Sequence, residues 1–230
     1  MDTLKHLIKN FCKKYELEFY DNCILKKVSN ISEFIRNDNS TYYYDRKDLI
    51  DNAYGMLYED SSKQWIILID ENQNPADFFA TLIHEYVHLC DYKKLTEIRN
   101  NLPLRELQND YVFLYWTEFH ATYLSNRFLI GFNPTGINVN AAQNQIVVEL
   151  TKYYSSSLKL NRAESMDKTV RSYGSYLALY DEFCTEMSLY PDQYYYNKVF
   201  LEIYRFLKGH KTFDTFIAAY NDFHNLCERM

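Results

Sequence analysis

The stretch Asn74–Lys93, with the sequence NPADFFATLIHEYVHLCDYK, decides the fold of this chain. Asn74 suits a helix N-cap, Pro75 the first helical position, and Asp77 places an acidic group in the first turn. Apolar residues then recur at helical spacing along one face: Ala80, Ile83, Val87 and Cys90. The pattern predicts a helix from residue 75 to about residue 93 that packs one face against a core.

A different face of this helix carries an H-E-x-x-H motif at residues 84–88. Side chains four residues apart lie above one another on a helix, so His84 and His88 can direct ring nitrogens to one metal ion. Glu85 lies beside them and suits the role of general base toward a water molecule. A catalytic zinc site has three protein ligands and an open position. The motif therefore predicts a Zn²⁺ site that lacks one ligand.

The candidates for the third ligand are five residues that follow the motif in the sequence: Asp91, Glu97, Glu106, Glu118 and His120. Residues 111–130 predict a second helix, on which Glu118 shares a face with the small residue Ala121 and could approach the first helix closely. We favour Glu118, because two histidines and one glutamate are a common catalytic zinc set. His120 lies two positions further, faces away from Glu118 and is the alternative.

Residues 65–69 form a continuous apolar run that predicts a buried strand. Residues 54–58 precede it across a polar turn, so the two segments are expected to pair as an antiparallel hairpin beside the motif helix. The edge of this small sheet could accept an extended peptide through main-chain hydrogen bonds. Residues 40–44 predict a further strand.

The remaining segments have helical patterns. An N-terminal helix is expected in residues 1–20, and residues 30–33 resemble a capping box before a short helix. Four more helices are expected in the C-terminal region: 142–158, 166–189, 194–207 and 213–227. The break at residues 131–136 divides the chain into a core at 1–132 and a helical region at 133–230. The predicted fold class is α+β and mostly helical.

Composition excludes several classes of protein. A chain of 230 residues with 47% hydrophobic side chains can bury a substantial core. Its net charge of −6 argues against a general nucleic-acid binder. The sequence predicts neither a secretory signal nor an apolar run of about 18 residues that could span a membrane. Five widely spaced cysteines suggest reduced thiols, and hence a cytoplasmic protein.

The strand at 65–69, the motif helix with residues 79–88 and the later segment Glu118–Ala121 resemble the ImmA/IrrE-like zinc metallopeptidases. The resemblance covers roughly residues 50–130 and implies a zincin-like core. It implies that His84, His88 and Glu118 bind zinc. It also implies an endopeptidase that acts on an intracellular protein, which in several family members is a DNA-binding repressor.

These observations predict a zinc-dependent endopeptidase with a protein or peptide substrate. Zinc lowers the pKa of a water molecule to near 7, and Glu85 would take its proton and return it to the leaving amine. Donors for the developing oxyanion remain open among four residues: Tyr173, Tyr176, His210 and His224. The alternative is a non-catalytic binding or regulatory protein on a metallopeptidase scaffold. An intact Glu85 favours the enzyme, because a scaffold would not need a base there.

Overall fold

The computed structural model describes residues 2–132, 136–156, 162–183 and 198–229. The chain divides into two compact units, residues 1–109 and residues 110–230. The division expected from the sequence, into a core at residues 1–132 and a helical region at residues 133–230, stays a prediction.

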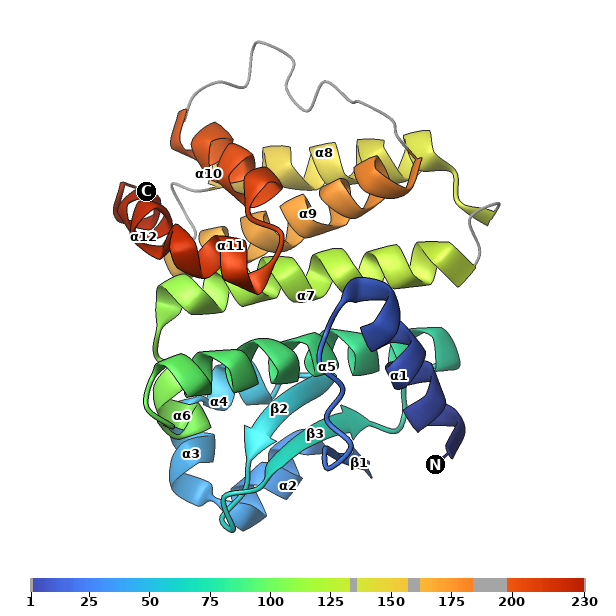
Figure 1. Cartoon of the computed structure of the whole chain (residues 1–230), viewed down its shortest axis with the longest axis vertical. Helices are drawn as coiled ribbons and strands as arrows, with labels where there is room; N and C mark the ends of the chain where they lie inside the picture. Colours follow the sequence, from blue (N-terminus) through green and yellow to red (C-terminus); the bar gives the residue numbers. More distant parts are fainter. Residues whose placement is uncertain (1, 133–135, 157–161, 184–197, 230) are drawn as a thin grey trace. The chain divides into compact units, whose positions relative to one another are not determined.

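The first unit is a small sheet with helices on both faces (Figure 1). Its described elements, in chain order, are α1 (Asp2–Tyr15), β1 (Ile24–Val28), α2 (Ile31–Asp38), α3 (Ser40–Asp45), α4 (Lys47–Ile50), β2 (Gly55–Glu59), β3 (Trp65–Asp70), α5 (Pro75–Ile98) and α6 (Leu104–Leu107). The predicted α+β class and the predominance of helix are confirmed.

The sheet has three strands in the order β1-β3-β2. Strand β2 pairs antiparallel with β3, with Leu57 opposite Ile67, which confirms the expected hairpin. Strand β1 pairs parallel with β3, with Leu25 opposite the same Ile67. The sheet is therefore mixed, and the expectation of a purely antiparallel sheet was wrong. Strand β1 was not predicted from the sequence, because Lys26 and Lys27 interrupt its apolar pattern. Both lysines are exposed on this edge strand.

Helices α2 to α4 cover one face of the sheet, and α5 lies along β2 and β3 on the other (Figure 1). Successive side chains of a strand point to opposite faces, so alternate residues of β2 and β3 pack against helices α2 to α4. This layer is a cluster of buried side chains: Ile31, Ile35, Tyr42, Tyr43, Ile50, Met56, Tyr58, Ile66 and Leu68. Burial of these side chains holds helices α2 to α4 against the sheet.

Residues 40–45 form helix α3 and not the predicted strand. The side chain of Asn39 accepts a hydrogen bond from the backbone N–H of Tyr42 at 3.0 Å and so caps the helix. Consecutive residues of a strand would point to opposite faces, whereas Tyr42 and Tyr43 are both buried in one cluster. The aromatic residues that suggested a strand are accommodated by a short capped helix.

The described elements of the second unit are all helices (Figure 1). Its elements are α7 (Tyr111–Phe132), α8 (Val139–Ser156), α9 (Arg162–Phe183), α10 (Lys198–Gly209), α11 (Phe213–Ala218) and α12 (Tyr220–Glu228). Helices α7 and α9 run side by side in the same direction, and α8 connects them. The predicted helices overlap α7 to α10, and their segments 157–158, 184–189 and 194–197 lie outside the described residues.

The helix predicted at 213–227 is two helices, α11 and α12, which meet at Ala219. Thr212 starts α11 with a reciprocal capping box to Thr215. The break directs Phe216 and Phe223 into one cluster, where their ring centroids lie 5.9 Å apart. Periodicity alone did not reveal the interruption, because both halves present apolar residues at helical spacing.

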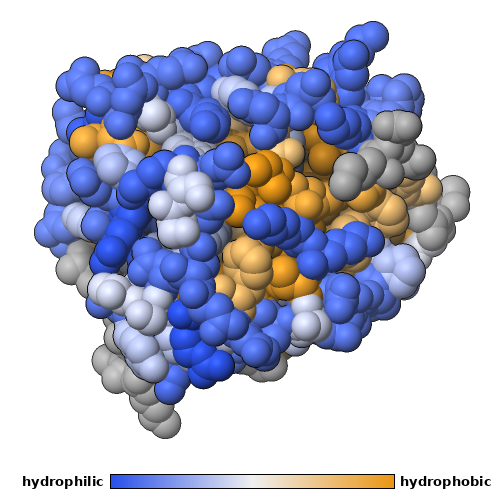
Figure 2. All heavy atoms as spheres, turned by 90° about the horizontal axis from the view of Figure 1, so that it is seen from below, coloured by the Kyte–Doolittle hydropathy of each residue, from blue (hydrophilic) through white to orange (hydrophobic). Residues whose placement is uncertain are grey.

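Apolar and polar side chains share the molecular surface. Figure 2 shows apolar side chains gathered in the middle of one face, with polar side chains around them. In the first unit, Ile24, Val28 and Phe34 are partly buried at the margin of the sheet cluster. Among the described residues, no helix combines the length and the hydropathy that crossing a bilayer requires.

Candidate metal centre

Helix α5, which covers one face of the sheet in the first unit, carries the H-E-x-x-H motif. The side chain of Asn74 accepts a hydrogen bond from the backbone N–H of Asp77 at 3.0 Å, which confirms the predicted N-cap. The helix ends at Ile98, five residues beyond the expected end. Its motif turn is buried on the polar face as well, with His88 6% and Glu85 8% exposed. The motif therefore has restricted access to solvent.

His84 and His88 converge, because they lie one turn apart on α5. Their Nε2 atoms are 3.0 Å apart, and the ring planes meet at 82°. Two ligands bonded at about 2.0–2.1 Å to one tetrahedral zinc would have their nitrogens about 3.4 Å apart. The observed separation also suits a hydrogen bond between a protonated and an unprotonated nitrogen. The pair can therefore supply two ligands to one metal ion after a small adjustment.

Glu85 contacts the sheet through its carboxylate. Oε2 accepts a hydrogen bond from the backbone N–H of Leu57 at 2.9 Å, in a buried position. The carbonyl of Leu57 accepts a hydrogen bond from Nε2 of Gln108 at 3.3 Å. Both outward-facing backbone groups of Leu57 on edge strand β2 thus have side-chain partners. The expectation of an edge open to an extended peptide is therefore wrong at this residue.

Gly55 allows α5 to pass this close to β2. A Cβ atom at position 55 would lie 2.2 Å from Cγ2 of Thr81 and 3.1 Å from Cγ of Glu85. Such contacts are too short for any residue with a side chain. The sequence contains a signal for this approach, since an isolated glycine in a strand often marks a close backbone neighbour, and the chain has only 5 glycines.

The side of α5 that carries Tyr86 anchors it to the segment after α1. The hydroxyl of Tyr86 accepts a hydrogen bond from the backbone N–H of Tyr20 at 2.8 Å. Burial raises the pKa of the Tyr86 phenol, so it is uncharged at neutral pH. One turn further, a hydrogen bond to Cys12 and burial raise the pKa of the Cys90 thiol. These groups fix the helix and supply no nucleophile.

Glu118 and His120 both lie on α7, in the second unit. His120 is 3% exposed and stacks on the indole ring of Trp116, with ring centroids 4.7 Å apart. The Glu118 side chain is 12% exposed, and its Oε2 lies 2.8 Å from a guanidinium nitrogen of Arg171 on α9. His120 is thus a packing residue of an aromatic cluster, whereas Glu118 belongs to a charged group.

The remaining candidate ligands and oxyanion donors differ in burial and in the residues that they contact. Asp91 is buried on α5, whereas Glu97 and Glu106 are exposed. Each expected oxyanion donor has a contact within the second unit. Tyr173 donates to the Phe200 carbonyl, Tyr176 packs against Tyr204, Nδ1 of His210 lies 2.7 Å from the Phe206 carbonyl, and Nε2 of His224 lies 3.3 Å from the Tyr111 hydroxyl. These contacts do not assign the oxyanion role to one of the four.

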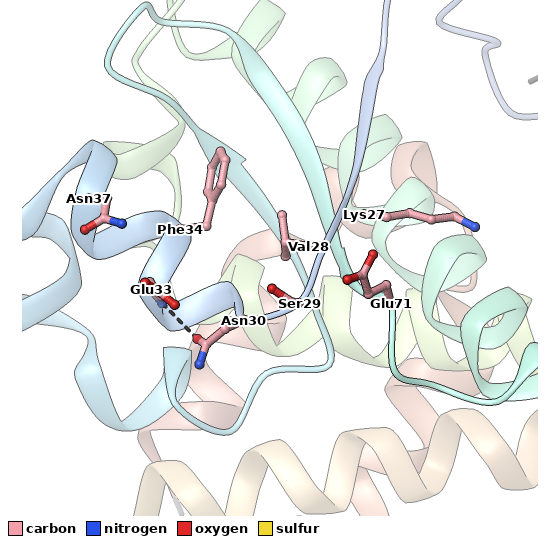
Figure 3. A pocket seen from close by; sticks show the side chains of 8 residues that line it. All are labelled: Lys27, Val28, Ser29, Asn30, Glu33, Phe34, Asn37 and Glu71. Carbon is pink, nitrogen blue, oxygen red and sulfur yellow. Dashed lines mark hydrogen bonds between the residues drawn. The ribbon is translucent and has the colours of Figure 1, made fainter.

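A hollow of about 450 Å³ lies beside the end of β1 and the start of α2, and includes none of the predicted site residues (Figure 3). Its lining includes Lys27, Glu33 and Glu71, and the Asn30 side chain already accepts the Glu33 backbone N–H at 2.9 Å. Small-molecule sites are mostly apolar with a few polar groups. The hollow lacks this character, and we assign no ligand to it.

Comparison of the chain with known protein families, with curated proteins and with solved structures gave no match.

Proposed function

We propose that the chain is a zinc-dependent endopeptidase in which His84, His88 and Glu118 bind the metal ion and Glu85 is the general base. The observation that carries the proposal is the convergence of the two imidazoles, with Nε2 atoms 3.0 Å apart, beside Glu85 on a buried helix. As a donor set, two imidazoles and one carboxylate could hold a metal ion. The proposal includes a zincin-like core and the ImmA/IrrE-like family, as the sequence resemblance implies.

The residues of the chain would share the chemistry as follows. Zinc, when bound, supplies a Lewis acid that activates water near neutral pH and polarises a peptide carbonyl. Glu85 would accept a proton from the water and pass it to the leaving amine. The burial of His88 and Glu85 would strengthen electrostatic interactions at the site. In the proposed reaction, the Leu57 N–H orients the Glu85 carboxylate through its hydrogen bond to Oε2.

One observation favours a second candidate, a binding or regulatory protein on a metallopeptidase scaffold. The hydrogen bond from Leu57 to Glu85 gives this glutamate a structural task, because a buried backbone N–H without a partner costs about 1–3 kcal/mol. The presence of Glu85 therefore does not by itself require catalysis. Both candidates retain the metal ligands, and only the enzyme requires the acid–base function of Glu85.

Metal content tests the proposal directly. The parent protein, Glu118→Ala and His120→Ala would be dialysed against a low concentration of zinc and analysed for metals. We expect one zinc per chain in the parent and in His120→Ala, and its loss or weakening in Glu118→Ala. A parent without zinc would overturn the peptidase. Loss of zinc from His120→Ala alone would identify His120, and not Glu118, as the third ligand.

Turnover separates the two candidate functions. The zinc-loaded parent would be incubated with a mixed peptide library, and new amino termini would be identified by mass spectrometry. We expect cleavage by the parent and about 10²–10⁴-fold less by Glu85→Gln, which keeps an acceptor oxygen for Leu57 but not the base. Zinc binding without cleavage would favour the scaffold.

A further inference from the structure

Glu118 is held in the second unit by an ion pair that the sequence analysis did not anticipate. Nη2 of Arg171 lies 2.8 Å from Oε2 of Glu118. Nε of the same guanidinium group donates to both carboxylate oxygens of Asp167, at 3.2 Å and 3.1 Å. Arg171 is therefore tied to its own helix through Asp167 and reaches across to α7 with the rest of its guanidinium group.

The backbones of α7 and α9 approach each other closely next to this ion pair. A Cβ atom on Gly174 would lie 2.7 Å from the carbonyl oxygen of Phe119, the residue after Glu118. Arg171 and Gly174 are three residues apart on α9 and share a face of the helix. The absence of a side chain at position 174 brings the helices together where the arginine must reach the glutamate.

We propose that Arg171 is a positioning residue, which orients the Glu118 carboxylate for the metal ion. The inference rests on the proposed function, because it assigns a role toward a ligand named there. Carboxylates that bind metals are commonly held by a second hydrogen-bonding partner, which fixes their orientation. A carboxylate has about four acceptor positions, so a guanidinium group and a metal ion can bind it together.

The chemistry of arginine suits this role. Its planar guanidinium group presents donors in a fixed geometry, whereas a lysine ammonium group rotates freely and acts as a point charge. The Glu118 side chain is 12% exposed and that of Arg171 is 42% exposed. An ion pair that solvent reaches on one side contributes little to folding, typically about 0.2–1 kcal/mol. Its removal should therefore change metal binding far more than it changes stability.

The second unit contains a matched control pair. Nε of Arg127 on α7 lies 2.7 Å from Oε1 of Glu182 on α9, with side-chain exposures of 27% and 21%. This pair joins the same two helices at a different level and does not involve Glu118. Arg127→Met therefore removes a comparable interhelical ion pair without changing the proposed ligand.

The experiment compares zinc affinity of the full chain by competition with a chromogenic chelator. We expect Arg171→Met to bind zinc about 10–100-fold more weakly than the parent. Arg171→Lys should recover part of this loss, and Arg127→Met should bind as the parent does. With Co²⁺ in place of zinc, the visible absorption bands should shift in Arg171→Met and not in Arg127→Met. Circular dichroism would check that each variant is folded.

The outcomes separate this inference from the proposed function. Zinc binding that depends on Glu118 but is unchanged in Arg171→Met, with an unchanged Co²⁺ spectrum, would overturn the role of Arg171 alone. An equal loss in Arg171→Met and Arg127→Met would assign both arginines to helix packing and would also overturn it. A parent protein that binds no zinc would overturn the metal centre, and the role of Arg171 with it.

Discussion

The backbone N–H of Leu57 donates a hydrogen bond to Oε2 of Glu85, at 2.9 Å and away from solvent. This contact joins an edge strand of the sheet to the motif helix at the residue proposed as general base. It fixes the direction of the carboxylate and satisfies a backbone donor that has no strand partner. Glu85 therefore has both a structural and a proposed chemical role, and substitutions can separate them.

Two substitutions of Glu85 should have different effects on stability and activity. Glu85→Gln retains an acceptor for the Leu57 N–H, so its free energy of unfolding should remain close to that of the parent. Glu85→Ala should lose about 1–3 kcal/mol, because the buried donor loses its partner. Peptide cleavage should fall about 10²–10⁴-fold in both. Denaturant unfolding and the cleavage assay measure the two effects, and equal stabilities of the two variants would contradict the structural role.

Gly55→Ala should destabilise the first unit by about 1–3 kcal/mol, because overpacking displaces α5 from β2. The new Cβ would meet Cγ2 of Thr81, at the 2.2 Å given above. Thr81→Ser removes that methyl group and keeps a hydroxyl to donate to Gln73. The double variant should therefore recover much of the lost melting temperature. A double variant no more stable than Gly55→Ala would show that Thr81 is not the obstacle.

A third prediction compares two helical glycines of the second unit. Gly174→Ala should lower stability by about 1–3 kcal/mol, since its Cβ would collide with the Phe119 backbone, which cannot rotate away. Gly209→Ala meets no atom within 4 Å and should be neutral or stabilising by up to about 1 kcal/mol. Thermal melts of both variants test the difference. Similar destabilisation by both would refute the close approach of α7 and α9.

The lowered pKa of Asp38 predicts that the stability of the protein falls in acid. Burial raises its pKa, but hydrogen bonds from Tyr58 and Ser61 outweigh this effect and leave the pKa of the carboxyl lowered. A lowered folded-state pKa stabilises the protein above the unfolded value of about 3.9, and this contribution is lost as the pH falls through the folded value. The melting temperature of Asp38→Asn should lie below that of the parent at pH 7, and the gap should narrow below about pH 4. Tyr58→Phe should show a smaller gap, and a gap independent of pH would contradict the assignment.

The helices and the hairpin were predictable because their signals are local. Asn74, Pro75 and Asp77 mark the start of α5 within four residues, and H-E-x-x-H fixes two imidazoles on one turn. Strand β1 was not predictable in this way. Its place depends on pairing with β3, some forty residues later, and its lysines suit only an exposed edge. Helix α3 was missed because its cap, Asn39, outweighs the strand preference of three consecutive tyrosines.

The surroundings of the proposed site were less predictable than its residues. Glu85 is contacted by the Leu57 N–H and lies close to the backbone of Gly55, and Glu118 is contacted by the Arg171 guanidinium group. These partners come from distant parts of the sequence. Such contacts depend on tertiary packing, and a single sequence shows no periodicity that marks them. Only the scarcity of glycine hinted at one of them.

The contact of Gly55 with Thr81 has a further consequence for how the first unit folds. A shift of two residues keeps every side chain of a strand on its own face, so the hydrophobic pattern alone does not exclude it. A shift of two residues would bring Ala53 or Leu57 beneath Thr81, where only a glycine fits. Docking of helix α5 therefore disfavours these shifted registers of β2. We expect the sheet to reach its final register only when this helix docks.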